Sequence, residues 1–214
     1  MRMIFFFLLI SNIYAVNAQK SLAEFTAQYR LSYYSDNEKK LSSTFTIHVK
    51  GAWSRTDVAS KSGTEVTIYD SKNGIGRIYK DYSGQKLLIQ FNQQEWISMQ
   101  SGMNVSSFEE KGSDIPYNGY VCNKVIGKNG KKQLVEMVYI PSLIPENKSY
   151  QMAFPEVKGL PAEIKLSTIK DNKQLTVVYE LLELSTDLVN TNVFEPSTNG
   201  YRVLSYTEMN KDKN

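Results

Sequence analysis

The chain has 214 residues, one cysteine, one histidine and a formal net charge of +3. This length suits one domain with a core of its own, and a lone cysteine excludes an internal disulfide. The 25 basic and 22 acidic residues are interspersed, with no basic stripe, so the composition argues against a nucleic-acid-binding protein.

Residues 1–18 have the layout of a secretory signal peptide. Arg2 gives a short basic region, Ile4 to Val16 form an apolar run too short to cross a bilayer as a helix, and Ala18 ends a small-residue cleavage site. A buried N-terminal strand is the weaker alternative, since three consecutive phenylalanines near a basic residue suit export better. No cysteine follows the predicted cleavage site for lipid attachment. We therefore expect residues 19–214 to form a single exported domain, periplasmic or secreted, and not an integral membrane protein.

The first elements predicted after the signal are two strands of an antiparallel hairpin. Apolar and polar residues alternate through residues 25–33, a polar break follows at residues 35–40, and the alternation resumes within residues 41–49. A period of two places alternate side chains on one face of a strand. The face predicted to be buried carries Phe25, Tyr29, Leu31, Phe45, Ile47 and Val49.

Further strands, separated by turn residues, continue to the C-terminus. With the first two they make about ten, at spacings typical of sandwiches and open barrels; in chain order they are residues 66–69, 78–82, 87–91, 121–126, 134–140, 164–169, 175–184 and a short one within 201–206. Asn129-Gly130 is the strongest hairpin signal, because both residues tolerate a positive φ.

Helix and loop are expected in a few places between these strands. A short amphipathic helix containing Trp96 and Met99 is predicted at residues 93–102, and a second helix is possible at residues 185–191. Residues 101–118 and the proline-containing residues 141–161 break the strand rhythm. Since proline is excluded from central strands, we expect these two stretches to be loops or edge segments.

The sequence shows no catalytic or metal-binding set. Three short matches to serine β-lactamase elements, at residues 35–37, 61–63 and 83–86, fall on predicted turns and in reversed order. His48 lies on the polar face of its strand, where a solvated imidazole is expected, and one histidine with one cysteine cannot complete a metal site. We therefore expect no enzymatic activity, no cofactor and no metal.

Cys122, in the stretch YNGYVCNKVIG, is predicted to be a small buried core residue on a face shared with Tyr120 and Ile126. Two reactive alternatives are less favoured. One is a thiol activated by Lys124, and the other is a dyad with His48, which would need a third orienting group.

Several short motifs within residues 119–201 carry a resemblance to a known family. They are Gly119-Tyr120-Val121-Cys122-Asn123-Lys124, residues 137–141, Gly159-Leu160-Pro161-Ala162-Glu163-Ile164, and Val193-Phe194-Glu195-Pro196 followed by Gly200-Tyr201. On these motifs the chain resembles an exported Bacteroidota family of unknown function with GLPGLI-type features, although Ala162-Glu163-Ile164 stands where that pattern has Gly-Leu-Ile. More widely it is similar to the LolA/LolB-like superfamily of outer-membrane lipoprotein carriers.

The resemblance implies an all-β dominated fold with a few short helices. Its strands would form a curved antiparallel sheet, an incomplete or half-open barrel whose mouth the helices cover. It also implies a hydrophobic cavity and no catalysis.

Two functional hypotheses follow. In the first, the protein is a carrier or sensor that binds a lipid or lipoprotein acyl chain inside the half-barrel; the residues assigned to this site are Phe25, Tyr29, Leu31, Phe45, Ile47, Val49, Trp96 and Met99. The many tyrosines and phenylalanines suit such a wall, but they suit a filled core equally well. In the alternative, the protein is a structural or protein-interaction module of the cell envelope, without a small-molecule ligand, and residues 141–161 contact an envelope protein partner.

Overall fold

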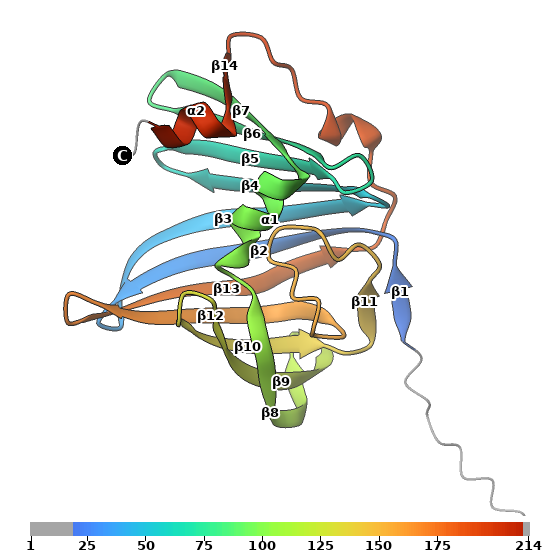
Figure 1. Cartoon of the computed structure of the whole chain (residues 1–214). Helices are drawn as coiled ribbons and strands as arrows, with labels where there is room; N and C mark the ends of the chain where they lie inside the picture. Colours follow the sequence, from blue (N-terminus) through green and yellow to red (C-terminus); the bar gives the residue numbers. More distant parts are fainter. Residues whose placement is uncertain (1–18, 212–214) are drawn as a thin grey trace, which may run out of the picture.

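The computed structural model describes residues 19–211, and the predicted signal peptide lies outside the described residues. Strands account for 63% of the structure and helices for 9%, so the predicted β-dominated fold class is confirmed. Twelve strands form one large curved sheet that is not closed into a barrel, and Figure 1 shows it running from β14 at the top to β8 at the bottom. In the part of the chain that is described, no helix is both long and apolar enough to cross a membrane.

The strands of the large sheet are ordered β14-β7-β6-β5-β4-β3-β2-β13-β12-β10-β9-β8. Neighbours run antiparallel, except that β14 runs parallel to β7. The bounds are β2 Glu24–Ser35, β3 Glu38–Lys50, β4 Trp53–Ser60, β5 Gly63–Asp70, β6 Ile75–Tyr82, β7 Gln85–Asn92, β8 Val105–Tyr117, β9 Tyr120–Asn129, β10 Leu134–Ile140, β12 Leu160–Lys170, β13 Lys173–Ser185 and β14 Arg202–Ser205. Two short strands, β1 (Lys20–Leu22) and β11 (Leu143–Pro145), pair in parallel as a second sheet.

The predicted strands are all present, and four strands are absent from the sequence prediction. β1 and β11 have only three residues each. β4 lacks an apolar alternation because its buried positions hold Ser54 and Thr56. β8 occupies the first rhythm-breaking stretch and is the last strand of the sheet, mostly exposed and interrupted by register shifts. For that stretch the edge-segment alternative is therefore confirmed.

The tight turns between strands occur where Asx and Gly residues allow a positive φ, although not at the site singled out. Asp36-Asn37 and Asp171-Asn172 take positive φ values of 49° and 66°, and of 51° and 61°. Asn129-Gly130 does begin a hairpin loop, but this loop is longer than a two-residue turn, and its left-handed residue is Lys132 at 60°. The reason is the buried Asn129 side chain, whose Oδ1 accepts hydrogen bonds from the N–H groups of Lys131 and Gln133.

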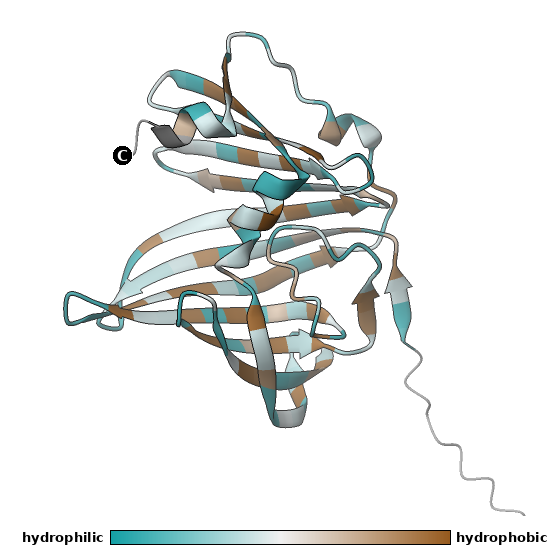
Figure 2. Cartoon of the chain, in the orientation of Figure 1, coloured by the Kyte–Doolittle hydropathy of each residue, from teal (hydrophilic) through white to brown (hydrophobic). Residues whose placement is uncertain are grey.

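The sheet buries apolar side chains on both faces, and Figure 2 shows hydrophobic and hydrophilic positions alternating along its strands. The main core lies on the concave face between β2, β3 and the strands from β8 to β13. A second cluster on the same face lies over β5 to β7 and contains Tyr69, Phe91 and Trp96. A third cluster lies on the convex face, where Phe194 packs against Trp53 with ring centroids 6.0 Å apart.

Four segments outside the sheet cover these clusters. The helix α1 (Gln93–Ser101), which agrees with the predicted short helix, and the C-terminal helix α2 (Tyr206–Lys211) pack on the second cluster of the concave face. Residues 146–159, called the cover segment below, lie within the proline-containing stretch and pack on the main core. The convex cluster is covered by residues 189–201.

The second helix, considered at residues 185–191, is wrong. β13 extends to Ser185, the residues after it are irregular, and a single turn of 3-10 helix, η1 (Thr191–Phe194), follows. The Asn190 side chain accepts a hydrogen bond from the N–H of Asn192 at 2.9 Å, which starts the turn later than the apolar pattern suggests.

Candidate functional site

Six of the eight residues assigned to a ligand site lie on one face of β2 and β3, as the alternation predicts. Each is at most 2% exposed: Phe25, Tyr29, Leu31, Phe45, Ile47 and Val49. The protein itself covers them. The Tyr150 ring of the cover segment lies edge-on to Phe25 at 5.9 Å, and Tyr29 Oη donates a hydrogen bond to the Pro161 carbonyl at 2.9 Å. These six side chains therefore form filled core on the concave face.

The other two predicted residues, Trp96 and Met99, come from α1 and lie over a different part of the concave face. The Trp96 ring stacks on Tyr69 at 4.5 Å with 18° between the planes, and on Phe91 at 5.6 Å with 12°. Gly76 is required beneath this stack, because a Cβ atom there would lie 1.9 Å from the Phe91 ring. The structure thus separates the eight residues into a core set and a pair on α1.

The position of α1 is fixed at its start. The Asn92 side chain accepts a hydrogen bond from the Glu95 N–H at 3.0 Å, and the Glu95 carboxylate accepts one from the Asn92 N–H at 2.8 Å. This capping box satisfies two backbone donors that the first helical turn leaves free. The helix therefore begins directly after β7, and its orientation packs Trp96 on the concave face of the sheet.

A cavity of about 240 Å³ lies between α1, the cover segment and the concave face of the sheet. Most of its wall is apolar: Ile78, Trp96, Met99, Met103, Met152, Leu166 and Tyr179; the polar lining residues are Glu65, Thr67, Gln100 and Gln151. Only Trp96 and Met99 belong to the predicted set. Sequence reasoning missed Met103 and Met152 because they lie in irregular segments, where no alternation marks a buried position. Met99 and Met103, four residues apart, are the one signal that was available.

A second hollow of about 180 Å³ lies on the other side of α1. Its lining shares Trp96, Gln100 and Met103 with the first and adds side chains of the cover segment, among them Tyr150 and Ala153. The helix is therefore the partition between two spaces. Ile97, on the outer side of α1, is 50% exposed.

The one charged residue of the cavity wall, Glu65, is paired with a lysine outside the wall. Glu65 Oε2 lies 2.9 Å from Lys80 Nζ, so the carboxylate is compensated. Burial raises the pKa of Tyr179 well above its usual range and also raises the pKa of Tyr33 and of Tyr82. Of these tyrosines, Tyr179 lines the cavity, and its hydroxyl stays protonated near neutral pH.

The cover segment holds one residue in a costly backbone conformation. Met152 has φ = 67° although it is 7% exposed and its side chain lines the cavity. The turn around it is closed by a hydrogen bond from the Ala153 N–H to the Tyr150 carbonyl at 3.0 Å, and Thr56 Oγ1 donates to Gln151 Oε1 at 2.5 Å. Left-handed residues of this kind cost about 1–2 kcal/mol, so surrounding contacts hold Met152 in place.

The structure places Cys122 in the main core with its side chain fully buried, and burial raises the pKa of its thiol. The predicted core role is confirmed, although its buried neighbour along β9 is Val125 rather than Ile126. Lys124 pairs with Glu136 at 3.0 Å. His48 lies on the convex face, with four strands between β3 and β9, so the two residues form no dyad.

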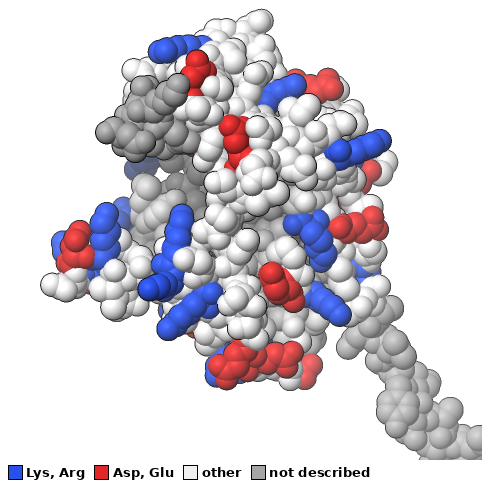
Figure 3. Space-filling model, viewed as in Figure 1, with Lys and Arg blue, Asp and Glu red and all other residues white. Residues whose placement is uncertain are grey.

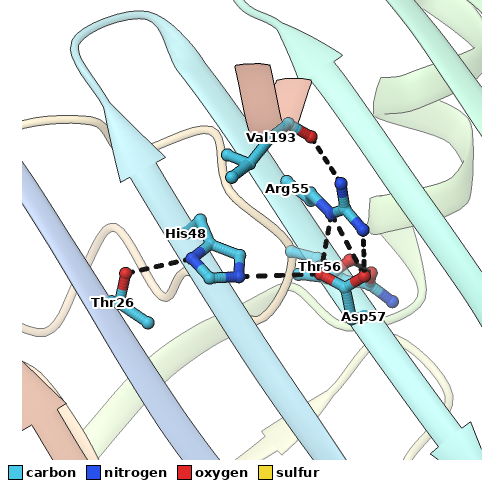
Figure 4. A network of polar contacts seen from close by, with 7 residues as sticks. Thr26, His48, Arg55, Thr56, Asp57 and Val193 are labelled. Atoms are coloured by element: carbon cyan, nitrogen blue, oxygen red, sulfur yellow. Dashed lines mark hydrogen bonds and ion pairs between the residues drawn. The ribbon is translucent and has the colours of Figure 1, made fainter. Parts of the chain in front are cut away.

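His48 is half-buried in a polar network, which corrects the expectation of a solvated imidazole (Figure 4). Its Nδ1 lies 3.0 Å from Thr26 Oγ1, and its Nε2 lies 3.8 Å from Asp57 Oδ2. Arg55 donates to the Asp57 carboxylate at 2.8 Å through Nε and to the Val193 carbonyl at 2.5 Å through Nη1. Burial lowers the pKa of His48, while the nearby Asp57 carboxylate raises it to a lesser degree.

The order of hydroxyl, imidazole and carboxylate in this network resembles that of a hydrolase triad, but the geometry does not suit one. The imidazole–carboxylate distance of 3.8 Å exceeds a hydrogen bond, and Asp57 is already engaged by Arg55. Thr26 is paired on both sides, with β3 and with β13, so its backbone is held within the sheet. The network instead ties β2, β3 and β4 to η1, which covers the convex face. Among residues 19–211 there is also no group of three or more His, Cys, Asp or Glu placed to hold a metal ion.

Neither a family model nor a curated protein matches the sequence. Among solved structures, the chain is similar to a structure of PNGF-II with a TM-score of 0.49 and 11% identity over 86% of this chain, and it spans about a third (33%) of the length of that structure. It is also similar to the ywiB protein from Bacillus subtilis, with a TM-score of 0.16 and 12% identity over 78% of this chain and 97% of the other. Both scores lie below 0.5, so these similarities do not enter the functional argument.

Proposed function

We propose that this protein is an exported, non-enzymatic binding protein that holds an apolar ligand, such as the acyl chain of a lipid, in the cavity beneath α1. The observation that carries this proposal is the predominantly apolar wall of that cavity, with its polar groups confined to a few side chains. Ligand sites for small molecules have this composition. The location is the periplasm or the exterior, supported by the signal-peptide layout of residues 1–18.

The size and the wall of the cavity suit a flexible chain. Its volume of about 240 Å³ lies just below the roughly 300–1,000 Å³ typical of ligand pockets. Displacement of α1, the partition, would join it to the second hollow. Met99, Met103 and Met152 supply unbranched, adaptable side chains that can follow the shape of a ligand. In this mechanism α1 closes the cavity, and the capping box at its start determines how readily the helix moves.

The alternative, an interaction module of the envelope, finds less support in the surfaces it would use. The proline-containing stretch turns Tyr150, Met152, Phe154 and Val157 into the core, where a partner cannot reach them. The edge strand β8 carries bulges, charged side chains and Pro116, features that oppose pairing with another strand. Exposed apolar residues such as Leu188, at 87%, are the main feature that favours a protein partner.

Titration with a fluorescent fatty acid tests the proposal. The purified protein should bind the probe saturably, and Met99→Gln should weaken binding about tenfold, because an unpartnered amide in an apolar wall costs roughly 1–2 kcal/mol. Met209→Gln is the matched control, since Met209 packs on the same aromatic cluster but does not line the cavity. Circular dichroism checks that both variants are folded. A folded wild type with no saturable binding, and a native mass spectrum with a stoichiometric protein partner in place of lipid, would favour the interaction module.

A further inference from the structure

Three hairpin tips lie next to one another at the same end of neighbouring strands of the large sheet. They connect β2 to β3, β12 to β13 and β9 to β10, and these strand pairs are neighbours in the sheet. The first two tips are joined by hydrogen bonds of 2.9 Å between Asp36 and Gln174. The third is adjacent because Leu134 pairs with Ser167 of β12.

These tips concentrate positive charge. Their lysines, called the lysine rim below, are Lys39, Lys40, Lys128, Lys131, Lys132, Lys170 and Lys173. Against these seven lysines the tips carry three acidic residues, Asp36, Glu38 and Asp171, which gives +4, whereas the whole chain carries +3. Figure 3 shows the basic side chains gathered at the left of the molecule, where the tips lie.

Most of the rim charge is uncompensated. Lys40 pairs with Glu38, and within the described residues the other rim lysines make no ion pair. All seven side chains are exposed. Elsewhere on the sheet lysines are matched: Lys124 and Lys165 both pair with Glu136.

A groove of about 620 Å³ opens among the rim lysines. Its lining contains no acidic residue: Lys128, Lys131, Lys132, Leu134, Ser167, Thr168, Ile169 and Gln174. Ile169 lies among these lysines in the lining and is 78% exposed. The groove thus combines cationic side chains with an exposed aliphatic one.

We propose that the lysine rim docks the protein on the surface of an anionic lipid bilayer. Lysines near such a surface are attracted by the lipid phosphates, and an exposed Ile169 beside them can enter the interface between headgroups and acyl chains. The apolar part of the groove is aliphatic, with no aromatic side chain on which bases would stack, which favours a bilayer over a nucleic acid. The groove shares no lining residue with the cavity beneath α1, and the docking proposal does not depend on the proposed function.

Co-sedimentation with lipid vesicles tests the docking surface. The purified protein should bind vesicles of phosphatidylcholine mixed equally with phosphatidylglycerol, bind phosphatidylcholine alone far less, and dissociate as salt is raised. The triple variant Lys128→Gln, Lys131→Gln and Lys132→Gln should lower the partition coefficient about 100-fold, since each lysine near an anionic surface contributes about fivefold. Ile169→Ser should lower it about tenfold without altering the salt dependence.

The matched control removes the same charge away from the rim. Lys20, Lys72 and Lys158 are exposed, lie outside the three tips and line neither hollow beside α1, so their combined change to Gln should leave vesicle binding nearly unchanged. Equal losses in the two triple variants would overturn the proposal, because net charge alone would then govern binding. Absence of binding to the anionic vesicles at low salt would overturn the proposal as well. Binding to a DNA oligonucleotide but not to vesicles would show that the lysine rim binds nucleic acid instead of a bilayer. Probe binding in the cavity should be the same in both triple variants, so failure of one proposal is distinguishable from failure of the other.

Discussion

Replacing Met152 by glycine should be less damaging than replacing it by alanine, which reverses the order found in most strands and helices. Both changes remove the buried Met152 side chain beyond Cβ, at about 2–5 kcal/mol, and this loss cancels in the comparison. At φ = 67° the alanine retains the left-handed cost of about 1–2 kcal/mol, which glycine avoids. Against this, glycine loses roughly 0.5–1 kcal/mol more chain entropy on folding. The glycine variant should therefore be the more stable by about 0.5–1 kcal/mol.

Urea unfolding followed by fluorescence measures this difference. For a chain of this size it corresponds to a midpoint about 0.3 M higher and a melting temperature about 2 °C higher for Met152→Gly. The same pair of changes at Met137, fully buried in β10 and without a positive φ, provides the control, and there alanine should be the more stable. A Met152→Gly variant no more stable than Met152→Ala would show that the backbone of the cover segment is unstrained at this turn.

Two further predictions concern the convex network and the N-terminus. Burial lowers the pKa of His48, so the neutral imidazole contributes stability that is present above the unfolded pKa of 6.5 and is lost as pH falls through the folded pKa. The urea midpoint should therefore drop less between pH 7 and pH 5 in His48→Gln than in the wild type. An identical drop in the two proteins would contradict the assigned burial. N-terminal sequencing of exported protein should begin at Gln19, and a start upstream of Val16 would refute the predicted cleavage site.

The sequence predicts the sheet well where burial is one-sided. In β2 and β3 the alternation assigns six side chains to one face, and the structure buries all six. β4 escapes this logic because Ser54 and Thr56 occupy its inward positions, and β8 because an edge strand has little apolar surface to bury. Strand prediction therefore fails where the period of two carries no hydrophobic signal.

The composition of the cavity wall could not be predicted, since it depends on contacts between residues far apart in the sequence. Ile78, Met103, Met152 and Leu166 come from four separate segments and meet only after the sheet has curved. The same holds for His48, which the alternation correctly places on the polar face. Its burial comes from Arg55 and from η1, and no sequence pattern near His48 predicts either contribution.

The two parts of the concave face differ because their covers differ in bulk. Over β2 and β3, the cover segment contributes Tyr150, Met152, Phe154 and Val157, all buried, and these side chains fill the space. Over β5 and β6, the cover is the nine-residue helix α1, whose one buried side chain, Trp96, is committed to the aromatic stack. Too little side-chain volume then remains to close the space between the two covers, and methionines line what is left. The apolar face is therefore incompletely covered beneath α1, and this is why the ligand site is proposed there and not on the first hairpin.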